Sequence, residues 1–453
     1  MTEISFPPPF EERMQQMLGQ SWPAFQAVHT QPSPVSLRIN PSKPFELTGG
    51  TAIPWTQYGY YLQERPVFTL DPAIHAGAYY VQEASSMFLE QAVRQHVPAN
   101  EPLRVLDLCA APGGKSTHLA SLLNAESLLV SNEVIRSRAS ILAENIQKWG
   151  RNNVVVTNND PDDFTKLSGF FDVIVVDAPC SGEGLFRKDA GAMTEWSEDA
   201  VALCAARQKR ILADVWPALR EGGLLIYSTC TYNRAENEEN LKWLREEHSA
   251  EFLSLTIDPA WGVITVDEDN IHGYRLFPHR LAGEGFFLAV ARKTSEEKSI
   301  NIKAGKDQFT TLPKKLTAQV NSWINEPDTK SFILRDDLIQ CLPGNWRSEI
   351  GYLARNLRLV CAGTFVATVK HEKLVPEHAL ALSEVLNRDA FNTWDLDKED
   401  ALRYLRKETI ATLPDTTGFC LVTYEGLALG WVNALANRVN NLYPAEWRIR
   451  MSS

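Results

Sequence analysis

Residues Val173 to Gly184 read V-I-V-V-D-A-P-C-S-G-E-G, and this stretch decides the fold class. Its apolar run before Asp177 is typical of a strand buried on both faces, as in a parallel sheet. A second run of this kind, over Leu224 to Thr231, carries Cys230. Ligands of open α/β sheets bind beyond the carboxyl ends of the strands. We therefore expect Asp177, Cys180 and Cys230 at a site where chemistry takes place.

The sequence around these two runs alternates between strand and helix patterns. Further strands are expected over residues 103–108, 127–132, 154–157 and 286–291, and helices from residue 116 and over 138–149, 198–219 and 233–247. Gly150 should cap the second of these helices, and Gly222 and Gly223 should end the third. This alternation predicts a doubly wound, Rossmann-like α/β domain with a parallel sheet.

Smaller regions lie on either side of this domain. We expect a small N-terminal α+β region over 1–95, the central domain over 96–293, a polar linker over 294–306, an accessory domain over 307–385 and a C-terminal domain over 386–453. The N-terminal region should hold a helix over 11–18 and a strand over 35–40. The C-terminal domain should hold a helix over 395–407 and strands over 418–424 and 427–432.

Composition and charge limit the classes of protein that this chain can be. It has 453 residues, of which 44% are hydrophobic and 22% charged, as is ordinary for a globular protein of several domains. The sequence shows neither an apolar run of roughly 18 residues nor a signal-peptide pattern, so we expect a cytoplasmic protein with no membrane partner. The net charge of −11 argues against bulk attraction to nucleic acid, so any such binding would need a local basic cleft.

The seven cysteines are scattered, and no C-x-x-C pair occurs. An odd number of widely spaced thiols is not a disulfide framework, and the histidines do not cluster with cysteines at zinc spacing. The sequence therefore predicts reduced thiols and no metal site.

The turn C-A-A-P-G-G-K follows the first strand of the central domain and lets the backbone approach a ligand closely. Two of its residues are glycines without the Cβ that would block such an approach, and they open a helix whose first N–H groups favour a carboxylate or phosphate. The turn matches neither the dinucleotide pattern G-x-G-x-x-G nor the P-loop pattern. The cofactor-binding residues expected in it are Cys109, Ala110, Ala111, Pro112, Gly113, Gly114 and Lys115.

Two acids follow the next strands of the sheet. Glu133 comes about 20 residues after Gly114, a spacing that suits an acid accepting both hydroxyls of a ribose. Asp160, past the third strand, is placed to bind an exocyclic amine of the same ligand. An acid at the ribose without a pyrophosphate cradle indicates S-adenosyl-L-methionine as the cofactor. The alternative is a glycine turn that serves only strand–helix packing, with Glu133 as a helix-capping acid.

Four motifs carry a family resemblance: D-L-C-A-A-P-G-G-K (Asp107 to Lys115), D-A-P-C-S-G-E-G (Asp177 to Gly184), F-R-K-D (Phe186 to Asp189) and Y-S-T-C-T (Tyr227 to Thr231). Together they resemble the RNA 5-methylcytosine methyltransferases of the NOL1/NOP2/Sun type. The resemblance covers residues 30 to 295. It implies a Rossmann-like methyltransferase domain that transfers a methyl group from S-adenosyl-L-methionine to carbon 5 of cytosine in RNA.

Two further features narrow the resemblance within this family. The first motif begins at Asp107, which leaves too little chain before it for the large N-terminal RNA-binding domain of one group. The stretch N-R-V-N-N-L-Y-P, Asn437 to Pro444, is similar to the PUA-like RNA-binding extension of a group that methylates 16S rRNA. This implies one cytosine of 16S rRNA, in the 30S subunit, as the substrate of a monomeric enzyme. The alternatives are tRNA or 23S rRNA as substrate, and a ribosome-assembly factor that binds RNA without turnover.

The resemblance also implies how the two thiols act. Carbon 5 of cytosine is a poor nucleophile until a thiolate adds to carbon 6. In the resembled family the Thr-Cys thiol attacks and the Pro-Cys thiol helps to release the product, which assigns attack to Cys230 and release to Cys180. DNA 5-methylcytosine enzymes instead attack with the Pro-Cys thiol. Asp177 is expected to hold or protonate N3 of the base, or else to contact the methionine end of the cofactor.

Other side chains are expected to meet the RNA. Lys115, Arg187 and Lys188 lie in or near the loops that would face RNA, and Lys188 is expected to help position the cofactor or the target nucleotide. The alternative is that these three are solvated loop cations. The stretch Arg38 to Asn40 is either an ordinary edge strand or an RNA-facing surface. The basic, aromatic tail either grips single-stranded RNA or packs on its own domain. The tail residues concerned are Tyr443, Trp447, Arg448 and Arg450.

Overall fold

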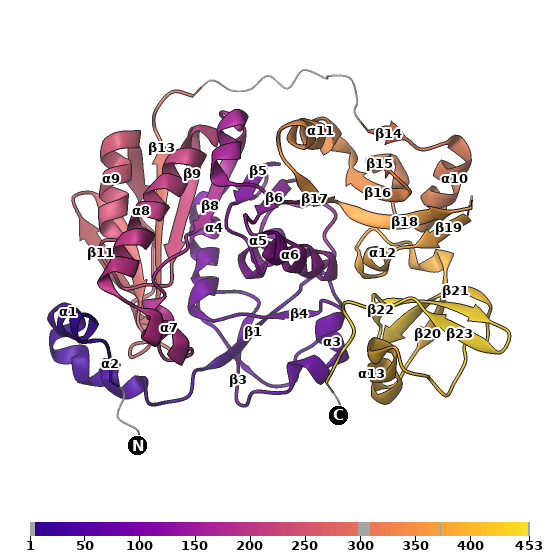
Figure 1. Ribbon diagram of the computed structural model, residues 1–453, viewed down its shortest axis with the longest axis horizontal. Coiled ribbons are helices and arrows are strands. Elements are labelled where there is room, and N and C mark those ends of the chain that lie inside the picture. Colours follow the sequence, from indigo (N-terminus) through magenta and orange to yellow (C-terminus); the bar gives the residue numbers. More distant parts are fainter. Residues whose placement is uncertain (1–4, 298–308, 372, 452–453) are drawn as a thin grey trace.

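A mixed sheet occupies the centre of the computed structural model, which describes residues 5–297, 309–371 and 373–451 (Figure 1). Within these residues, the sheet has ten strands in the order β11-β12-β13-β9-β8-β5-β6-β7-β17, with β10 paired to β13. The parallel strands are β5 (Arg104–Asp107), β6 (Leu128–Asn132), β7 (Val154–Thr157), β8 (Phe171–Asp177) and β9 (Leu219–Thr229). The antiparallel strands are β10 (Ala250–Leu253), β11 (Ile264–Glu268), β12 (Ile271–Leu276), β13 (Phe286–Lys293) and β17 (Leu359–Ala362).

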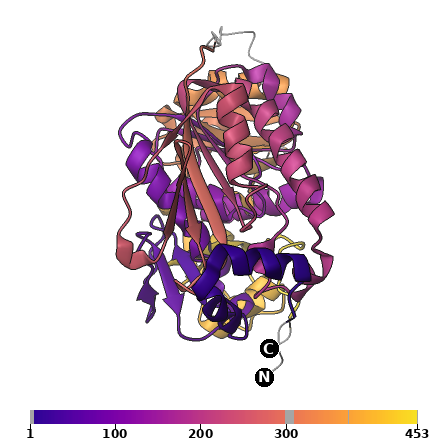
Figure 2. The same ribbon diagram turned by 90° about the vertical axis from the view of Figure 1, so that its left-hand side faces the viewer.

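Helices cover both faces of this sheet (Figure 2). One face carries α4 (Leu89–His96), α5 (Gly114–Leu122) and α6 (Arg136–Trp149); the other carries α8 (Glu198–Val215) and α9 (Glu238–His248). Alternate residues of β8 pack into the two layers, Val173 and Val175 on the first face and Ile174 and Val176 on the second. Such doubly buried strands require continuous apolar runs. The predicted doubly wound, Rossmann-like domain is confirmed.

The region between α8 and β9 differs from the prediction. The helix ends at Val215, because Pro217 follows and cannot donate a helical hydrogen bond. β9 already begins at Leu219, so Gly222 and Gly223 lie inside the strand and do not end the helix. Gly222 has φ of +69°, and the pairing of β8 with β9 shifts register here. The two glycines therefore mark a bulge in the strand.

The N-terminal region holds α1 (Pro8–Leu18), α2 (Trp22–Val28) and a second sheet. Its strand order is β2-β3-β1-β4, formed by β2 (Thr51–Ala52), β3 (Gly59–Leu62), β1 (Val35–Ile39) and β4 (Tyr79–Val81). β1 lies between β3 and β4, so the expectation of an edge strand is wrong. The side chain of Arg38 is fully buried and stacks on Trp149 of α6 at 4.5 Å, so the RNA-facing alternative is wrong as well.

The accessory region is built onto the central sheet. Its own sheet holds β14 (Thr310–Thr311), β15 (Lys330–Arg335), β16 (Leu338–Pro343), β18 (Thr364–Lys370) and β19 (Lys373–Pro376), with helices α10 (Lys314–Trp323), α11 (Arg347–Asn356) and α12 (His378–Leu382). β17, which lies between β16 and β18 in the sequence, is not part of this sheet and pairs with β7 of the central sheet. This pairing places Leu359 opposite Thr157. Ile350 and Leu353 of α11 pack on the same face as α8 and α9. Most of the expected linker, from residue 298 onward, lies outside the described residues.

The C-terminal region packs against the N-terminal sheet (Figure 1). It comprises β20 (Asn392–Asp395), α13 (Lys398–Arg406), β21 (Gly418–Tyr424), β22 (Leu427–Leu435) and β23 (Arg438–Asn441). Tyr443 is only 1% exposed, and Trp447 packs against His378 and Lys148. These two aromatic rings of the tail therefore pack on the protein, as one of the two alternatives expected, while Arg448 and Arg450 are exposed. None of the described helices is long and apolar enough to cross a membrane.

Candidate active site

The glycine turn joins the end of β5 to the start of α5. Gly113 has φ of +120°, a conformation that favours glycine, and it precedes the first residue of α5 without any side-chain cap. The first N–H groups of a helix have no acceptor within it. Ala110 N–H donates to the carbonyl of Asn132 (2.8 Å), and Arg138 donates to the carbonyl of Ala111 (2.8 Å). The turn is therefore fixed from the β6 side and leaves the start of α5 suited to an anionic group.

The side chain of Arg38 supports this turn through hydrogen bonds, a role that the sequence did not suggest. Its guanidinium donates to the carbonyl of Gly114 (3.2 Å) and to Oγ1 of Thr117 (2.6 Å). It also donates to Oε1 of Gln82 (2.9 Å). A strand of the N-terminal region thus holds the first turn of α5 in place.

Asn132 joins the ends of three adjacent strands. Its side-chain amide donates to the carbonyls of Leu108, after β5, and of Asn159, after β7 (3.1 and 3.0 Å). Its oxygen accepts from Oγ1 of Thr157 (2.8 Å). The residue is buried, and its position at the end of an apolar strand is the signal that points to it in the sequence.

Asp107 is the last residue of β5, beside the turn, and it is fully buried. Its Oδ2 accepts from Oγ of Ser116 (2.6 Å), whereas Oδ1 has no hydrogen-bond partner among the described residues. Burial raises the pKa of this carboxyl to about 7, and the charge of Asp177 adds to the effect. A buried oxygen without a protein donor favours a ligand that carries one.

Glu133 and Asp160 both lie past strand ends, but they differ in surroundings. Glu133 is buried; its Oε1 accepts from the N–H of Ile135 (2.9 Å) and its Oε2 lies 3.3 Å from Arg138. The carboxylate therefore accepts from the backbone of the turn before α6, whereas α6 itself has no side-chain cap, so the helix-capping alternative is not confirmed. Asp160 is 43% exposed and lies 3.6 Å from Arg210.

Lys115 and Asp177 form an ion pair across the site. Nζ of Lys115 lies 2.7 Å from Oδ2 of Asp177, whose Oδ1 accepts from Oγ of Ser228 (2.8 Å). Burial alone would lower the pKa of Lys115, but Asp177 outweighs it and the pKa is raised, so the side chain stays charged. Lys115 is 12% exposed and holds Asp177, so it does not extend outward towards RNA.

The two predicted thiols meet directly. The Sγ atoms of Cys180 and Cys230 are 3.0 Å apart, both residues are partly buried, and both are free cysteines. A hydrogen bond to Cys230 and burial raise the pKa of Cys180 well above its ordinary value. Either sulfur can donate in this contact, and the raised pKa of Cys180 keeps the proton on that thiol.

A buried polar network holds the loop that carries Cys180. Glu236 accepts from the N–H of Ser181 (2.8 Å) and from its hydroxyl (2.5 Å), and it also accepts from Gln208 (3.0 Å). Gln208 in turn donates to the carbonyl of Pro179 (2.9 Å). Burial raises the pKa of Glu236. No sequence pattern points to this network, because its members come from segments far apart in the chain.

The loops that carry the two thiols contact each other at Gly184, where there is no room for a side chain. Gly184 N–H donates to the carbonyl of Cys230 (2.8 Å), and a Cβ on Gly184 would lie 2.5 Å from the carbonyl oxygen of Gly285. Real Cβ atoms do not approach an oxygen so closely, so a side chain at this position would force the loops apart.

The structure also corrects the predicted RNA contact of Arg187. The side chain of Arg187 is 3% exposed and forms a two-pronged ion pair with Glu284 (2.9 to 3.1 Å). It also donates to the carbonyl of Gly283 (2.7 Å). The side chain of Arg187 thus makes contacts inside the protein, whereas that of its neighbour Lys188 is exposed. In the described part of the chain, no cluster of three or more histidine, cysteine or acidic side chains could hold a metal ion.

Comparisons with known proteins agree with this geometry. The model of the family described as 16S rRNA methyltransferase RsmB/F matches residues 96–292. Models of the N-terminal domain of 16S rRNA methyltransferase RsmF and of its PUA domain match residues 6–84 and 391–449. The central match contains the glycine turn and both thiols.

Whole-chain relatives and solved structures extend these matches. Ribosomal RNA small subunit methyltransferase F of Enterobacter sp. (strain 638) is 32% identical, covering 98% of this chain and 96% of the relative. That of Escherichia coli O157:H7 (strain EC4115 / EHEC) is 30% identical over the same shares. A methyltransferase homologue from Pyrococcus horikoshii is 27% identical with a TM-score of 0.55, covering 64% of this chain and 96% of that one. The NSun6 protein from the same organism shares the fold (TM-score 0.52, 20% identity, 64% and 99% covered). The chain therefore belongs to the RsmB/F family of 16S rRNA methyltransferases.

Proposed function

We propose that this protein transfers a methyl group from S-adenosyl-L-methionine to carbon 5 of one cytosine in 16S rRNA of the small ribosomal subunit, through a covalent bond between Cys230 and carbon 6 of the base. The observation that carries the proposal is the pair of thiols 3.0 Å apart at the same strand ends as Asp177. Full-length similarity to relatives named as small subunit rRNA methyltransferases supports the substrate. An rRNA substrate favours a cytoplasmic enzyme.

The residues at these strand ends fit the proposed cofactor. S-adenosyl-L-methionine carries a positive sulfonium and a positive ammonium, and the acids Asp107, Glu133 and Asp177 lie near one another at the strand ends. The unpartnered Oδ1 of Asp107 suits a ligand N–H donor, and the start of α5 suits the ligand carboxylate. When bound, the cofactor supplies an electrophilic methyl group.

The protein groups around the base account for the course of the reaction. The Cys230 thiolate adds to carbon 6 while a donor at N3 takes up the charge, which makes carbon 5 nucleophilic. In this proposal Asp177, which contacts Lys115 and Ser228, is the acid that passes a proton to N3 as the thiolate adds, and it takes this proton back when the aromatic ring is restored. After carbon 5 has gained the methyl group, it loses its proton to a base, and the Cys230–carbon 6 bond breaks to restore the aromatic ring. The 3.0 Å contact between the two sulfurs supports Cys180 as the group that assists that step.

Methyl transfer to purified substrates tests this function. Protein and cofactor with a labelled methyl group would be incubated with 30S subunits, naked 16S rRNA, 23S rRNA and tRNA. We expect label as 5-methylcytosine at one position of 16S rRNA, in the subunit or in the naked form. Label confined to tRNA or 23S rRNA would overturn the substrate, and binding without any label would indicate an assembly factor.

A further inference from the structure

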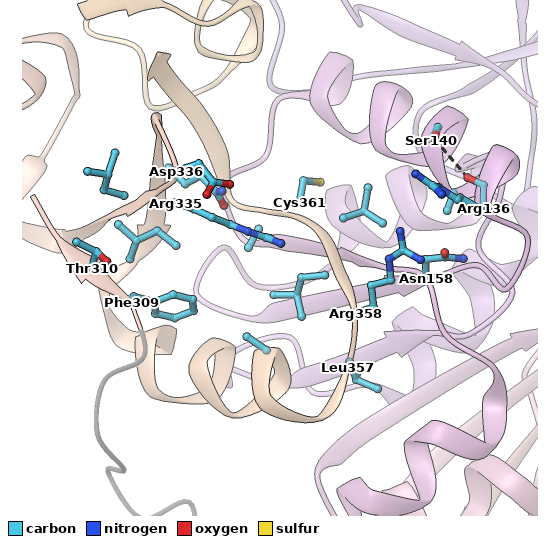
Figure 3. Close-up of a pocket in the computed structure, with 18 residues that line it drawn as sticks. Arg136, Ser140, Asn158, Phe309, Thr310, Arg335, Asp336, Leu357, Arg358 and Cys361 are labelled. Carbon is cyan, nitrogen blue, oxygen red and sulfur yellow. Dashed lines mark hydrogen bonds between the residues drawn. The ribbon is translucent and has the colours of Figure 1, made fainter. Parts of the chain in front are cut away.

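A groove of about 670 Å³ separates the central sheet from the accessory region. Its walls come from the start of α6 and from β17 on one side, and from the β15–β16 hairpin on the other. Figure 3 shows Arg335 reaching from the hairpin towards the side that carries Arg358, Asn158 and Arg136. The groove thus lies where the accessory region joins the central sheet through the pairing of β17 with β7.

The groove is locally basic in an acidic protein. Arg136, Arg335 and Arg358 line it, and Asp336 is the carboxylate among its lining residues. All three arginines are exposed, and none of their side chains has an ion pair or hydrogen bond among the described residues. By contrast, Arg187 and Arg275 elsewhere in the chain are buried against carboxylates. Unpaired guanidinium groups that converge from two regions suit phosphate oxygens, which they bind through a planar fork of donors.

The groove also offers groups suited to bases. Asn158 and Gln340 provide amide donors and acceptors, and the ring of Phe309, which has Arg347 over it at 5.8 Å, forms part of the wall. Amides can bond the edges of unpaired bases, and aromatic rings can stack on their faces. Single-stranded RNA offers unpaired base edges and base faces together with phosphates.

The groove opens at the same edge of the sheet as the thiols. β17 runs antiparallel to β7, so its first residue, Leu359, lies opposite Thr157 at the carboxyl end of β7. Asn158 N–H donates to the carbonyl of Arg358 (3.0 Å) at that edge. In the sheet, β8 and β17 are separated by β5, β6 and β7. At about 4.8 Å per strand spacing, the groove lies about 20 Å from the Cys180 loop, a distance that a few nucleotides of extended RNA span.

We infer that this groove binds the phosphate backbone of a single-stranded rRNA segment a few nucleotides from the target cytosine. The inference rests on the proposed rRNA substrate and adds a second RNA-binding site, distinct from the site of the two thiols. The accessory region then aligns the RNA, while the sheet carries out the chemistry. Binding at this groove explains how an otherwise acidic protein can act on a nucleic acid, because the positive charge that attracts phosphates is concentrated in one place.

The salt dependence of RNA binding tests the groove. The variant R136Q/R335Q/R358Q would be compared with the native protein by filter binding to a 16S rRNA transcript at several salt concentrations. Loss of three phosphate contacts should lower the affinity at least about tenfold near 0.1 M salt, and should reduce the slope of log K against log salt by about 2. The variant R136K/R335K/R358K should keep the slope, because it keeps the charges.

A matched control and a second substrate make the outcomes distinct. The variant K242Q/R245Q/R292Q loses three charges on α9 and β13 and should bind RNA as the native protein does. An unchanged slope in R136Q/R335Q/R358Q would overturn the inference. Binding lost only for 30S subunits and not for naked RNA would also overturn it, in favour of a ribosomal-protein contact. Methyl transfer by the native protein measures the proposed function separately, so its failure would not be confused with failure of the groove.

Discussion

The Sγ atoms of Cys180 and Cys230 lie 3.0 Å apart, and the N–H of Cys230 also donates to the sulfur of Cys180 (3.3 Å). Cys180 has its pKa raised by the hydrogen bond to Cys230 and by burial, so it retains its proton at neutral pH. We propose that two chemically identical side chains take different roles because their surroundings differ. The loop of Cys180 is held by Glu236, whereas Cys230 directly follows the strand β9.

Glu236→Gln should slow the reaction without weakening RNA binding. The amide cannot accept from the Ser181 N–H and hydroxyl at once as the carboxylate does, so the Cys180 loop loses its fixed position. Small misplacements of reacting groups cost about 100-fold in rate. Single-turnover methyl transfer should therefore fall by about 10- to 100-fold. Glu239→Gln, at an exposed neighbouring residue, is the control. Equal rates in the two variants would show that the network does not position the thiols.

Arg187→Ala should destabilise the protein and leave its RNA binding intact. The substitution leaves Glu284, which is 3% exposed, without its partner. Removing one member of a buried ion pair costs about 3–5 kcal/mol. Denaturant unfolding should show this loss, whereas the salt slope of RNA binding should not change. Lys188→Ala, at the adjacent exposed residue, should leave stability within about 0.5 kcal/mol. A reduced salt slope in Arg187→Ala would restore the RNA-contact interpretation.

Leu353→Ala, in the accessory region, should destabilise the catalytic sheet. Leu353 is fully buried in the cluster that also contains Leu212 and Ile174. Truncating such a leucine costs about 2–5 kcal/mol, whereas Arg355→Ala on the exposed side of the same helix should cost little. Thermal unfolding should show one transition, shifted down in Leu353→Ala. Two separate transitions, with the catalytic one unmoved, would contradict the shared core.

Acid should destabilise the contact between α12 and the C-terminal tail. Burial lowers the pKa of His378 to about 3, and Lys148 and Lys407 nearby act in the same direction. Because the unfolded chain binds the proton near pH 6.5, His378 contributes stability that is complete above that pH and is lost as pH falls towards 3. At pH 5 the loss is about 2 kcal/mol. His378→Phe keeps an aromatic ring against Tyr443 and Trp447, and its stability should fall less between pH 7 and pH 5. Equal losses in both proteins would contradict this.

Elements that depend on local pattern are predictable from the sequence. The buried run of β8, the helix capped by Gly150 and the hairpin of β21 and β22 are all continuous segments whose periodicity shows their structure. The meeting of Cys180 and Cys230 is also predictable, because the carboxyl ends of adjacent parallel strands converge.

Contacts between distant segments could not be predicted in this way. Arg38 reads as a solvent-facing cation, yet it is buried under α5 because Trp149 and Gln82 from other elements enclose it. β17 is a short strand whose place in the central sheet depends on α11 packing beside it. The sequence pattern of the two glycines of β9 predicts the end of a helix, because glycine is favoured both in helix caps and in β-bulges.

Trapping of the reaction intermediate tests the account most directly. Cys180→Ala would be mixed with cofactor and 16S rRNA, separated on a denaturing gel, digested with nuclease and protease, and analysed by mass spectrometry. We predict a stable protein–RNA adduct in which the nucleotide is attached to the peptide containing Cys230, and no adduct and no methyl transfer in Cys230→Ala. An adduct that forms in Cys230→Ala and is attached at Cys180 would contradict the account.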